Sequence, residues 1–439
     1  MDHHDRCREN GTGASSLRRR LPVTQITSHF TIYVLKERGM FPALSIVGVI
    51  ALIYISSPFP LWHSYFIVFF SSIKSTEISS KEKRALLGYL IKSFFYLPLS
   101  GLLYRLDDIF VRGYRKQEVA GPLFIISQPR SGTTFLLRTL AEDETNFFTL
   151  KHLDWRVPSI LAWRLFDFLG IRERLEKIDY WPNTEQGRLA SKMHAHTLGS
   201  IEGHGVFLEE NMYHHYFTWR RFPFANVLRR IEAVDSLSSY AKRKMVRGLA
   251  GVVRRGAYHR GNGRMWLTKE NENADFYREL YAAFPHARFL CIGREPGGFV
   301  NSYISASEAS IRAKHGINPH SLTGYHDDNL NFRIRQCQQQ MTFCQELEAK
   351  GAITYVDYAQ LLENIPGTLE RVYAELGIPM TDTFRHRLNE LQEIQRNRKR
   401  GYNNVKETVT GFENYSAFLE RYRVFPAPDM TPSLTSVEE

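Results

Sequence analysis

Cysteine is scarce in this chain. Only four occur in 439 residues, which is too few for a disulfide scaffold. Cys337 and Cys344 lie seven residues apart in a predicted helix, about 10 Å from each other, so they cannot pair there. Zinc-ligand spacings and recognised nucleic-acid-binding signatures are also missing, and the net charge of +11 is scattered along the chain. We therefore expect no nucleic-acid partner; the positive charge suits an anionic cofactor, substrate or lipid.

Charged side chains are missing from one long stretch, since no Asp, Glu, Lys or Arg occurs from Gly39 to Ile73. A membrane-spanning helix needs about 20 apolar residues, so this stretch is long enough. Pro58 and Pro60 divide it, and it can form one kinked span or a re-entrant hairpin. A cleavable signal peptide is not expected, because the apolar core begins far from Met1 and no small-residue cleavage site follows. The alternative is a buried hydrophobic hairpin of a soluble protein.

The composition divides the chain into five predicted segments: a flexible basic tail (1–38), a membrane anchor or hairpin (39–73), an amphipathic helical connector (74–118), a globular domain (119–425) and a disordered tail (426–439). Within the connector, an apolar series between 82 and 110 carries Lys92, Arg105 and Asp107, which favours a helix against a membrane surface or the domain over a second span. Lysine and arginine flank the uncharged stretch on both sides, so they do not indicate its orientation. Asn414-Tyr415-Ser416 is a glycosylation sequon and fits a lumenal domain.

The stretch Pro122–Leu140 has the pattern of a strand, a tight loop and a helix start. Leu123–Ile126 predicts a short buried strand, and Gln128–Gly132 cannot continue it. Backbone N–H groups at the start of the following helix, together with its dipole, favour an anion in the loop. Side chains that can bind the same anion lie in or next to the loop: Arg130, Ser131, Thr133 and Thr134. The sequence therefore predicts a phosphate-binding loop here.

This loop is not a Walker P-loop, G-x-x-x-x-G-K-[ST]. If Gly132 is its second glycine, the first should occupy position 127 and the lysine position 133, but Ser127 and Thr133 stand there. A second strand, loop and helix follow between 266 and 305, with Arg294 at the strand end and Ser302 eight residues later. A guanidinium and a hydroxyl so placed can hold one phosphate from two sides.

The remainder of the globular part alternates strands with helices. Further strands are predicted at Met265–Thr268, Arg288–Ile292 and Ile353–Val356. One apolar stripe runs from Phe276 to Phe284, and another ends at Gly377. The predicted fold class is α/β, with a parallel sheet flanked by helices and a ligand at the carboxyl ends of the strands. The segments 143–244 and 305–344 are expected to be mainly helical and to form the walls of an acceptor pocket.

The six residues Pro129–Thr134 resemble the 5′-phosphosulfate loop of sulfotransferases, which use 3′-phosphoadenosine 5′-phosphosulfate (PAPS). The pair Arg294 and Ser302 resembles the segment that binds the 3′-phosphate of PAPS in that family. Lys269 precedes Arg294 by 25 residues, and these spacings look like those of tyrosylprotein sulfotransferases. The resemblance covers roughly 121–377 and implies a P-loop NTPase-like sulfotransferase fold with PAPS as co-substrate. It implies a hydroxyl acceptor such as a carbohydrate, lipid or tyrosine, with no metal required.

The resemblance also implies roles for individual residues. Arg130 would neutralise the 5′-phosphosulfate, and Lys269 would support the leaving phosphate. The expected cofactor-binding residues are Arg130, Ser131, Gly132, Thr133, Thr134, Arg294 and Ser302. The segment Asp154-Trp155-Arg156 resembles the Glu-x-Arg segment that supplies the base in tyrosylprotein sulfotransferases and the Trp-Glu segment of carbohydrate-type relatives, although Asp is one carbon shorter than Glu. Asp154 is therefore the predicted base, with Arg156 beside it.

Other residues compete for the role of base. Glu209 and Glu210 resemble an acidic patch near the acceptor in many relatives, and several histidines have a suitable side chain: His194, His196, His204, His214 and His215. We expect a solvated or structural role, not a metal site, for His194 and His196, since no further ligand spacing accompanies them. Four tryptophans could stack on a sugar, but core packing is the favoured expectation: Trp155, Trp163, Trp181 and Trp219.

Two other function classes stay open at this stage. One is a phosphotransferase with a phosphate loop of non-Walker type, for which a magnesium requirement would speak. The other is a non-catalytic membrane protein that keeps a nucleotide-binding fold. For the favoured sulfotransferase, the expected location is a membrane, with a Golgi-type lumenal catalytic domain in a eukaryote or a cytoplasmic-face domain in a bacterium.

Overall fold

The computed structural model describes residues 48–49, 62–212, 222–223, 239–271, 274–397 and 409–423. The chain separates into two compact units, 1–56 and 57–439. Of the first unit, only Gly48 and Val49 are described, and both are helical. The predicted tails at 1–38 and 426–439 lie outside the described residues, as do His214, His215 and Trp219.

The second unit contains a five-stranded sheet in the order β2-β3-β1-β4-β5, and every neighbouring pair is parallel. The strands are β1 (Ala120–Ile126), β2 (Phe147–Phe148), β3 (Met265–Glu270), β4 (Arg288–Gly293) and β5 (Ile353–Asp357). Four of them contain the strands predicted from sequence. The two-residue strand β2 was not predicted, because two residues are too few to show a period.

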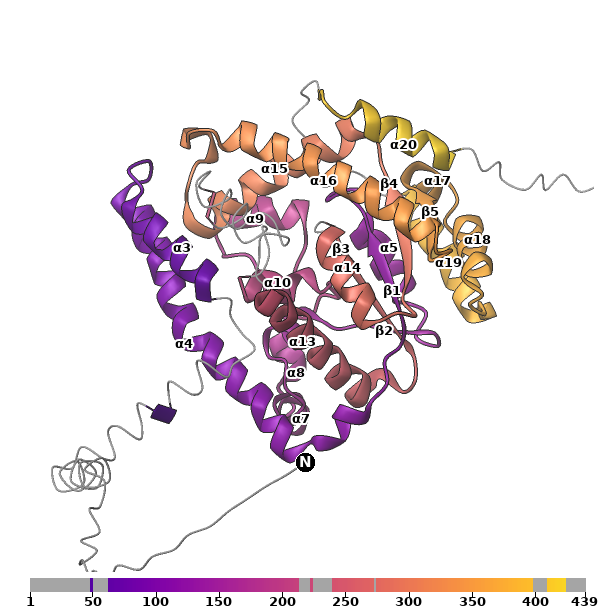
Figure 1. Ribbon diagram of the computed structural model, residues 1–439, viewed down its shortest axis with the longest axis horizontal. Coiled ribbons are helices and arrows are strands. Elements are labelled where there is room, and N and C mark those ends of the chain that lie inside the picture. The colour runs from indigo at the N-terminus through magenta and orange to yellow at the C-terminus, as the bar shows by residue number, and fades with distance from the viewer. Residues whose placement is uncertain are drawn as a thin grey trace, which may run out of the picture. The chain divides into compact units, whose positions relative to one another are not determined.

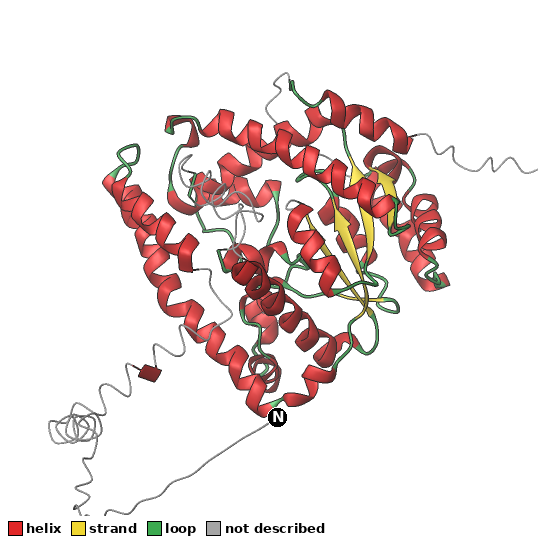
Figure 2. Cartoon of the chain, viewed as in Figure 1, coloured by secondary structure: helices red, strands yellow, loops and turns green. Residues whose placement is uncertain are grey.

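The sheet is buried on both faces, which explains why its strands are nearly continuous apolar runs. Leu123 and Ile125 of β1 pack into one cluster, and Phe124 and Ile126 pack into another on the opposite face. The central strands are yellow in Figure 2 and lie between layers of helices. The predicted α/β class with a parallel sheet flanked by helices is confirmed.

Each face of the sheet has its own set of helices. The face of Leu123 packs against α5 (Thr133–Leu140), α17 (Tyr358–Glu363), α18 (Ile365–Leu376) and α19 (Asp382–Arg396). The face of Phe124 packs against α13 (Ser239–Gly256), α14 (Ala274–Ala283), α15 (Pro296–His315), α16 (Tyr325–Glu348) and α20 (Glu413–Arg423). Both predicted apolar stripes are helices: the one that starts at Phe276 lies in α14, and the one that ends at Gly377 is α18. Gly377 ends α18 with a φ of 60°. Cys337 and Cys344 of α16 form no disulfide.

Along the sequence, short helices follow β2 and precede α13. They are α6 (His152–Arg156), α7 (Ile160–Phe168), α8 (Arg172–Glu176), α9 (Glu185–Met193) and α10 (Gly205–Glu210). The remaining turns are η1 (Arg112–Lys116), η3 (Ala257–Gly261) and η4 (Pro319–Ser321). The described parts of 143–244 and 305–344 are thus mainly helical and loop structure, as expected.

Two helices ahead of β1 form a hairpin along one edge of the second unit, drawn in indigo and purple in Figure 1. They are α3 (Trp62–Lys74) and α4 (Ser80–Phe110), and the Tyr65 hydroxyl on α3 donates a hydrogen bond to the Leu90 carbonyl on α4 at 3.0 Å. Ser79 caps α4, because its hydroxyl and the Glu82 carboxylate satisfy each other's backbone N–H groups. Within the described residues, α4 is the helix long and apolar enough to cross a membrane. Of the predicted segment 39–73, the structure describes 48–49 and 62–73.

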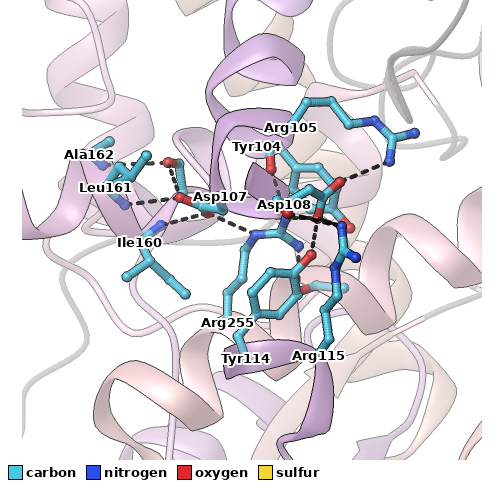
Figure 3. A network of polar contacts seen from close by, with 12 residues as sticks. Tyr104, Arg105, Asp107, Asp108, Tyr114, Arg115, Ile160, Leu161, Ala162 and Arg255 are labelled. Atoms are coloured by element: carbon cyan, nitrogen blue, oxygen red, sulfur yellow. Dashed lines mark hydrogen bonds and ion pairs between the residues drawn. The ribbon is translucent and has the colours of Figure 1, made fainter. Parts of the chain in front are cut away.

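A buried ion-pair network fixes the end of α4 to the domain (Figure 3). Asp107 accepts a hydrogen bond from Arg255 of α13 at 2.8 Å, and neither side chain is exposed to solvent. The Asp107 carboxylate also accepts from the backbone N–H groups of Ile160 and Leu161 at the start of α7. Arg255 donates to Asp108 as well, at 3.1 Å. Of the three charged residues predicted in this helix, Asp107 therefore points into the protein, whereas Lys92 and Arg105 are exposed.

Candidate active site

The loop between β1 and α5 adopts a backbone that few residues tolerate. Gly132 has φ of 94° and Arg130 has φ of 67°. A Cβ on Gly132 would lie 2.5 Å from the ring of Tyr358 at the end of β5. The chain turns back tightly here and presents the start of α5 to the carboxyl edge of the sheet.

The two predicted motifs meet at this loop. The Arg130 guanidinium donates a hydrogen bond to the Ser302 hydroxyl on α15 at 3.0 Å. Arg294, which follows β4, donates to the Arg130 carbonyl at 2.9 Å. Because β1 and β4 are parallel neighbours, their carboxyl ends meet at one edge of the sheet. This arrangement brings Arg130 to Ser302, although the two residues are 172 positions apart in the sequence. Arg130, Arg294 and Ser302 thus form one anion-binding corner.

Two further residues of the loop carry buried hydroxyl groups. The Thr133 hydroxyl donates to the Asn271 side-chain oxygen at 2.5 Å. Ser131 is fully buried, and its hydroxyl has no hydrogen-bond partner among the described residues. A buried hydroxyl without a partner is costly unless a ligand supplies one. The donor set of the loop therefore fits a phosphate or sulfate group.

Lys269 on β3 faces a carboxylate that the sequence reasoning missed. Its ammonium lies 3.8 Å from Glu202, whose other oxygen accepts from Arg138 at 2.9 Å and lies 3.4 Å from His194 Nε2. Glu202 is brought there by a close backbone approach, since a Cβ on Gly203 would collide with the Lys269 carbonyl. A signal was present in the sequence, because residues 193–205 concentrate three histidines, a glutamate and three glycines.

Burial and charge set the protonation of this pair. Burial lowers the pKa of His194, although the Glu202 carboxylate opposes the shift, so the imidazole is neutral near pH 7. Burial alone would raise the pKa of Glu202, but the hydrogen bond with His194 and the Lys269 ammonium oppose burial, and that pKa lies well below its usual range. A neutral histidine beside an ionised carboxylate is an arrangement that can accept a proton and stabilise the resulting imidazolium.

A second polar cluster lies beside the first. His152 Nδ1 and His196 Nε2 are 2.7 Å apart, and the Tyr180 ring stacks on His196 with centroids 4.4 Å apart. Lys314 on α15 donates to the Tyr180 hydroxyl at 2.6 Å and to Glu209 at 3.3 Å. Burial lowers the pKa of His152 to about 4, so His152 is neutral at physiological pH.

Both clusters and the phosphate-binding loop line one cavity of about 670 Å³. Many of the predicted site residues line it: Arg130, Gly132, Thr133, Thr134, His194, His196, Glu209, Glu210, Lys269, Arg294 and Ser302. Residues of its lining that were not predicted include His152, Tyr180, Glu202, Asn271 and Tyr358. The cavity is large enough for a nucleotide and part of an acceptor.

Asp154 does not line this cavity. It is 1% exposed, and its carboxylate accepts from the Lys151 N–H at 3.0 Å, Arg172 at 3.2 Å and Arg260 at 3.3 Å. The carboxylate therefore caps α6 and binds two arginines. This geometry speaks against the predicted base, and the physical reason is that both oxygens are already committed to cations.

Three other predicted residues also lie outside the cavity lining: Ser131, Arg156 and His204. The Arg156 guanidinium lies over the Tyr96 ring at 5.5 Å, and the nearby Glu210 carboxylate raises its pKa. His204 is fully buried, with Nδ1 3.0 Å from the Thr268 hydroxyl. Neither Arg156 nor His204 contributes to the cavity lining.

The tryptophans divide between core and cavity. Trp155 and Trp163 are each 1% exposed and belong to core clusters, as expected. Trp181 lines the cavity, and its indole N–H donates to the His194 carbonyl at 2.8 Å. Trp181 therefore positions the backbone of the histidine that faces Glu202.

A metal ion is the alternative occupant of the space between His194, His196 and Glu202. Ligand atoms of His194, His196 and Glu202 lie within 4.8 Å of one another, which is a usable spacing. Glu202, however, already contacts the cations Arg138 and Lys269. Two positive charges beside the only carboxylate of the set disfavour a dication, so we interpret the cluster as proton-handling.

Comparison with known proteins identifies the family. A sequence profile described as the sulfotransferase family matches residues 122–382, which span both anion-binding motifs. The chain belongs to the sulfotransferase family. Sulfotransferase STF9 from Mycobacterium avium has a similar structure, with a TM-score of 0.59, 13% identity and coverage of 80% of this chain and 87% of that one. Sulfotransferase STF1 from Mycobacterium tuberculosis H37Rv is similar with a TM-score of 0.52, 15% identity and coverage of 76% and 91%.

These likenesses establish the fold of the chain. The predicted sulfotransferase fold is confirmed, and so is the family suggested by Pro129–Thr134 and by the spacing of Arg294 and Ser302. No curated protein sequence matches the chain significantly. Sulfuryl transfer in general follows from family and fold, whereas donor and acceptor have to be argued from the cavity.

Proposed function

We propose that this sulfotransferase moves a sulfuryl group from PAPS to a hydroxyl acceptor. The observation that carries the proposal is the contact among Arg130, Arg294 and Ser302, in the same cavity as Lys269. A donor with phosphates at both the 5′ and 3′ positions needs two anion-binding groups close together, and this corner supplies them.

The proposed donor site uses the chain's own donors. Arg130, the Ser131 hydroxyl and the N–H groups at the start of α5 would bind the 5′-phosphosulfate. Arg294 and Ser302 would bind the 3′-phosphate. Lys269 would place its positive charge at the oxygen that bridges sulfur and phosphorus, where negative charge develops. PAPS supplies the activated sulfuryl group itself.

We assign the base to His194, held by Glu202. With Nε2–H directed at the carboxylate, Nδ1 is the nitrogen that can accept a proton. The acceptor oxygen attacks sulfur, its proton passes to His194, and the bond from sulfur to the 5′-phosphate oxygen breaks. The products are a sulfate ester and 3′-phosphoadenosine 5′-phosphate. Positioning and charge stabilisation supply the catalysis, as in-line transfer requires.

The acceptor end of the cavity is lined by aromatic and acidic side chains: Tyr180, Trp181, Glu209 and Glu210. Flat rings beside carboxylates suit a molecule that offers hydroxyl groups on an apolar face. A carbohydrate, a lipid hydroxyl or a tyrosine has that chemistry, and we propose an acceptor from these classes.

Thermal unfolding of the full chain tests the donor. We expect 3′-phosphoadenosine 5′-phosphate to stabilise the protein more than AMP or ATP does. At a hundred times its dissociation constant, it should raise the unfolding free energy by about 2.7 kcal/mol relative to the ligand-free protein. Arg294→Ala should remove this preference. Arg288→Ala is the matched control, since Arg288 is exposed at the other end of the same strand. Equal or stronger stabilisation by ATP would contradict the proposal and favour phosphoryl transfer.

A further inference from the structure

One side of α4 carries an apolar stripe that nothing among the described residues covers. Its inner side is buried in the domain through Leu86, Leu90 and Leu97. Large apolar side chains that are more than half exposed lie along the outer side: Ile91, Phe95, Leu99, Ile109 and Phe110. At 100° per residue these positions fall within about 100° of the helix, and at 1.5 Å per residue they extend about 28 Å. An ordered stripe of this length marks an interaction surface.

The neighbouring helix repeats the pattern. On α3, Phe66, Phe70 and Ile73 are 45%, 53% and 44% exposed and recur at helical spacing on one face. The uncharged run that begins at Gly39 leads directly into this helix. The hairpin therefore shows exposed apolar side chains on both of its helices.

Length and composition would let α4 cross a bilayer, but its contacts oppose a crossing. Its end is fixed by the Asp107–Arg255 ion pair, which is fully buried against α7 and α13 (Figure 3). Its inner face packs on the domain, and a crossing would place those polar partners in hydrocarbon. A helix held in this way can meet lipid along its side.

The charge around the stripe indicates which lipid. Exposed cations occur in the first half of α4, near its end and in the turn that follows: Lys81, Arg84, Lys92, Arg105, Arg112, Arg115 and Lys116. Among the acidic residues of the same region, Glu82 caps the helix, Asp107 binds Arg255, and Asp108 binds Arg255, Arg105 and Arg115. Lys81, Arg84, Lys92, Arg112 and Lys116 still leave the region with a net positive charge. Cations flanking an apolar face are typical of helices that lie on anionic bilayers.

We propose that the α3–α4 hairpin lies in the plane of an anionic lipid surface, with the outer stripe of α4 inserted among the headgroups. The surface is independent of the proposed reaction, because the cavity residues lie elsewhere. An in-plane helix buries its stripe by about 5–10 Å along its whole length. A spanning helix would instead place Ile91 and Ile109 near opposite interfaces and Leu99 near the centre.

Depth measurement separates these cases. We would label the full chain at Ile91→Cys, Leu99→Cys or Ile109→Cys with an environment-sensitive fluorophore, in a Cys7→Ser background, since the three other cysteines are buried. Ile394→Cys is the matched control, because Ile394 is an equally exposed apolar residue on α19, away from the hairpin (Figure 1). The probe is a vesicle of phosphatidylcholine and phosphatidylserine, with quenchers attached at shallow or deep positions of the acyl chains.

The proposal predicts a blue shift at all three hairpin positions, with equal loss of intensity to the shallow quencher and none at Ile394. Quenching at Leu99 by the deep quencher alone would show a spanning helix and overturn it. A blue shift that appears without vesicles and is insensitive to both quenchers would show contact with a second copy of the chain, or with another part of it, and would also overturn it. Emission at all positions equal to that at Ile394 would exclude lipid contact.

Discussion

The substitution Glu202→Gln tests the proposed base most sharply. In the wild type, His194 must be neutral to accept the acceptor's proton, so turnover rises as pH rises through its pKa and then reaches a plateau. Burial lowers that pKa below the ordinary value of 6.5. The acid limb of the wild-type profile is therefore expected below pH 6.5.

The size of the effect follows from the geometry. Glu202 lies 3.4 Å from His194 Nε2 and raises its pKa against the effect of burial. A nearby opposite charge is worth about 1–3 pH units. In Glu202→Gln the acid limb of the pH–rate profile should therefore shift to lower pH by about 1–3 units. The plateau should fall roughly tenfold for each unit, since the imidazolium loses about 1.36 kcal/mol of stabilisation per unit.

The assay is the pH dependence of kcat with saturating donor, alongside binding of 3′-phosphoadenosine 5′-phosphate. Arg138→Gln is the matched control, because it removes a different partner of Glu202 and keeps the carboxylate beside His194. We expect its acid limb to stay near the wild-type position. An unchanged limb and plateau in Glu202→Gln would refute the assignment of the His194–Glu202 pair.

Three further substitutions test the loop, the buried ion pair and the rejected base. Gly132→Ala should weaken nucleotide binding about tenfold, because a left-handed backbone costs an L-residue about 1–2 kcal/mol, whereas Gly297→Ala meets no neighbouring atom and should be neutral. Arg255→Met should lower the unfolding free energy by about 3–5 kcal/mol, since it leaves a buried carboxylate uncompensated, and the exposed Arg254→Met should not. Asp154→Asn should lower the melting temperature and preserve nucleotide binding and turnover per folded molecule.

Each of these has a result that would contradict it. For the loop, wild-type affinity in Gly132→Ala would mean that its backbone is not required for the donor. For the ion pair, equal melting temperatures of Arg255→Met and Arg254→Met would show that the network contributes little. For the rejected base, a stable Asp154→Asn protein that binds nucleotide but does not turn over would restore Asp154 to the reaction.

The sequence predicts the donor side of this site well, because its residues sit at fixed distances from strand ends. Arg130 and Arg294 each follow an apolar run, and parallel strands carry their carboxyl ends to one edge. Local pattern and topology together therefore bring Arg130 to Ser302. The same reasoning yields the sheet, except for the two residues of β2.

The acceptor side could not be predicted in the same way. Glu202 lies in a loop whose course depends on backbone bridges such as Lys151 to Ile201, which join segments far apart in sequence. The sequence alone does not show which of the two carboxylates, Glu202 or Asp154, faces Lys269. Only the three-dimensional neighbours do, since Asp154 meets Arg172 and Arg260 and Glu202 meets Lys269 and His194.

Transfer of labelled sulfur from PAPS tests the central claim most directly. The full chain would be incubated with the donor, a chelator and a panel of carbohydrate, lipid and tyrosine acceptors, as wild type and as His194→Ala. We predict a labelled sulfate ester from the wild type, and about 10²–10⁴-fold less from a variant that still binds 3′-phosphoadenosine 5′-phosphate. Nucleotide binding without transfer to any acceptor, or full activity in His194→Ala, would contradict the account.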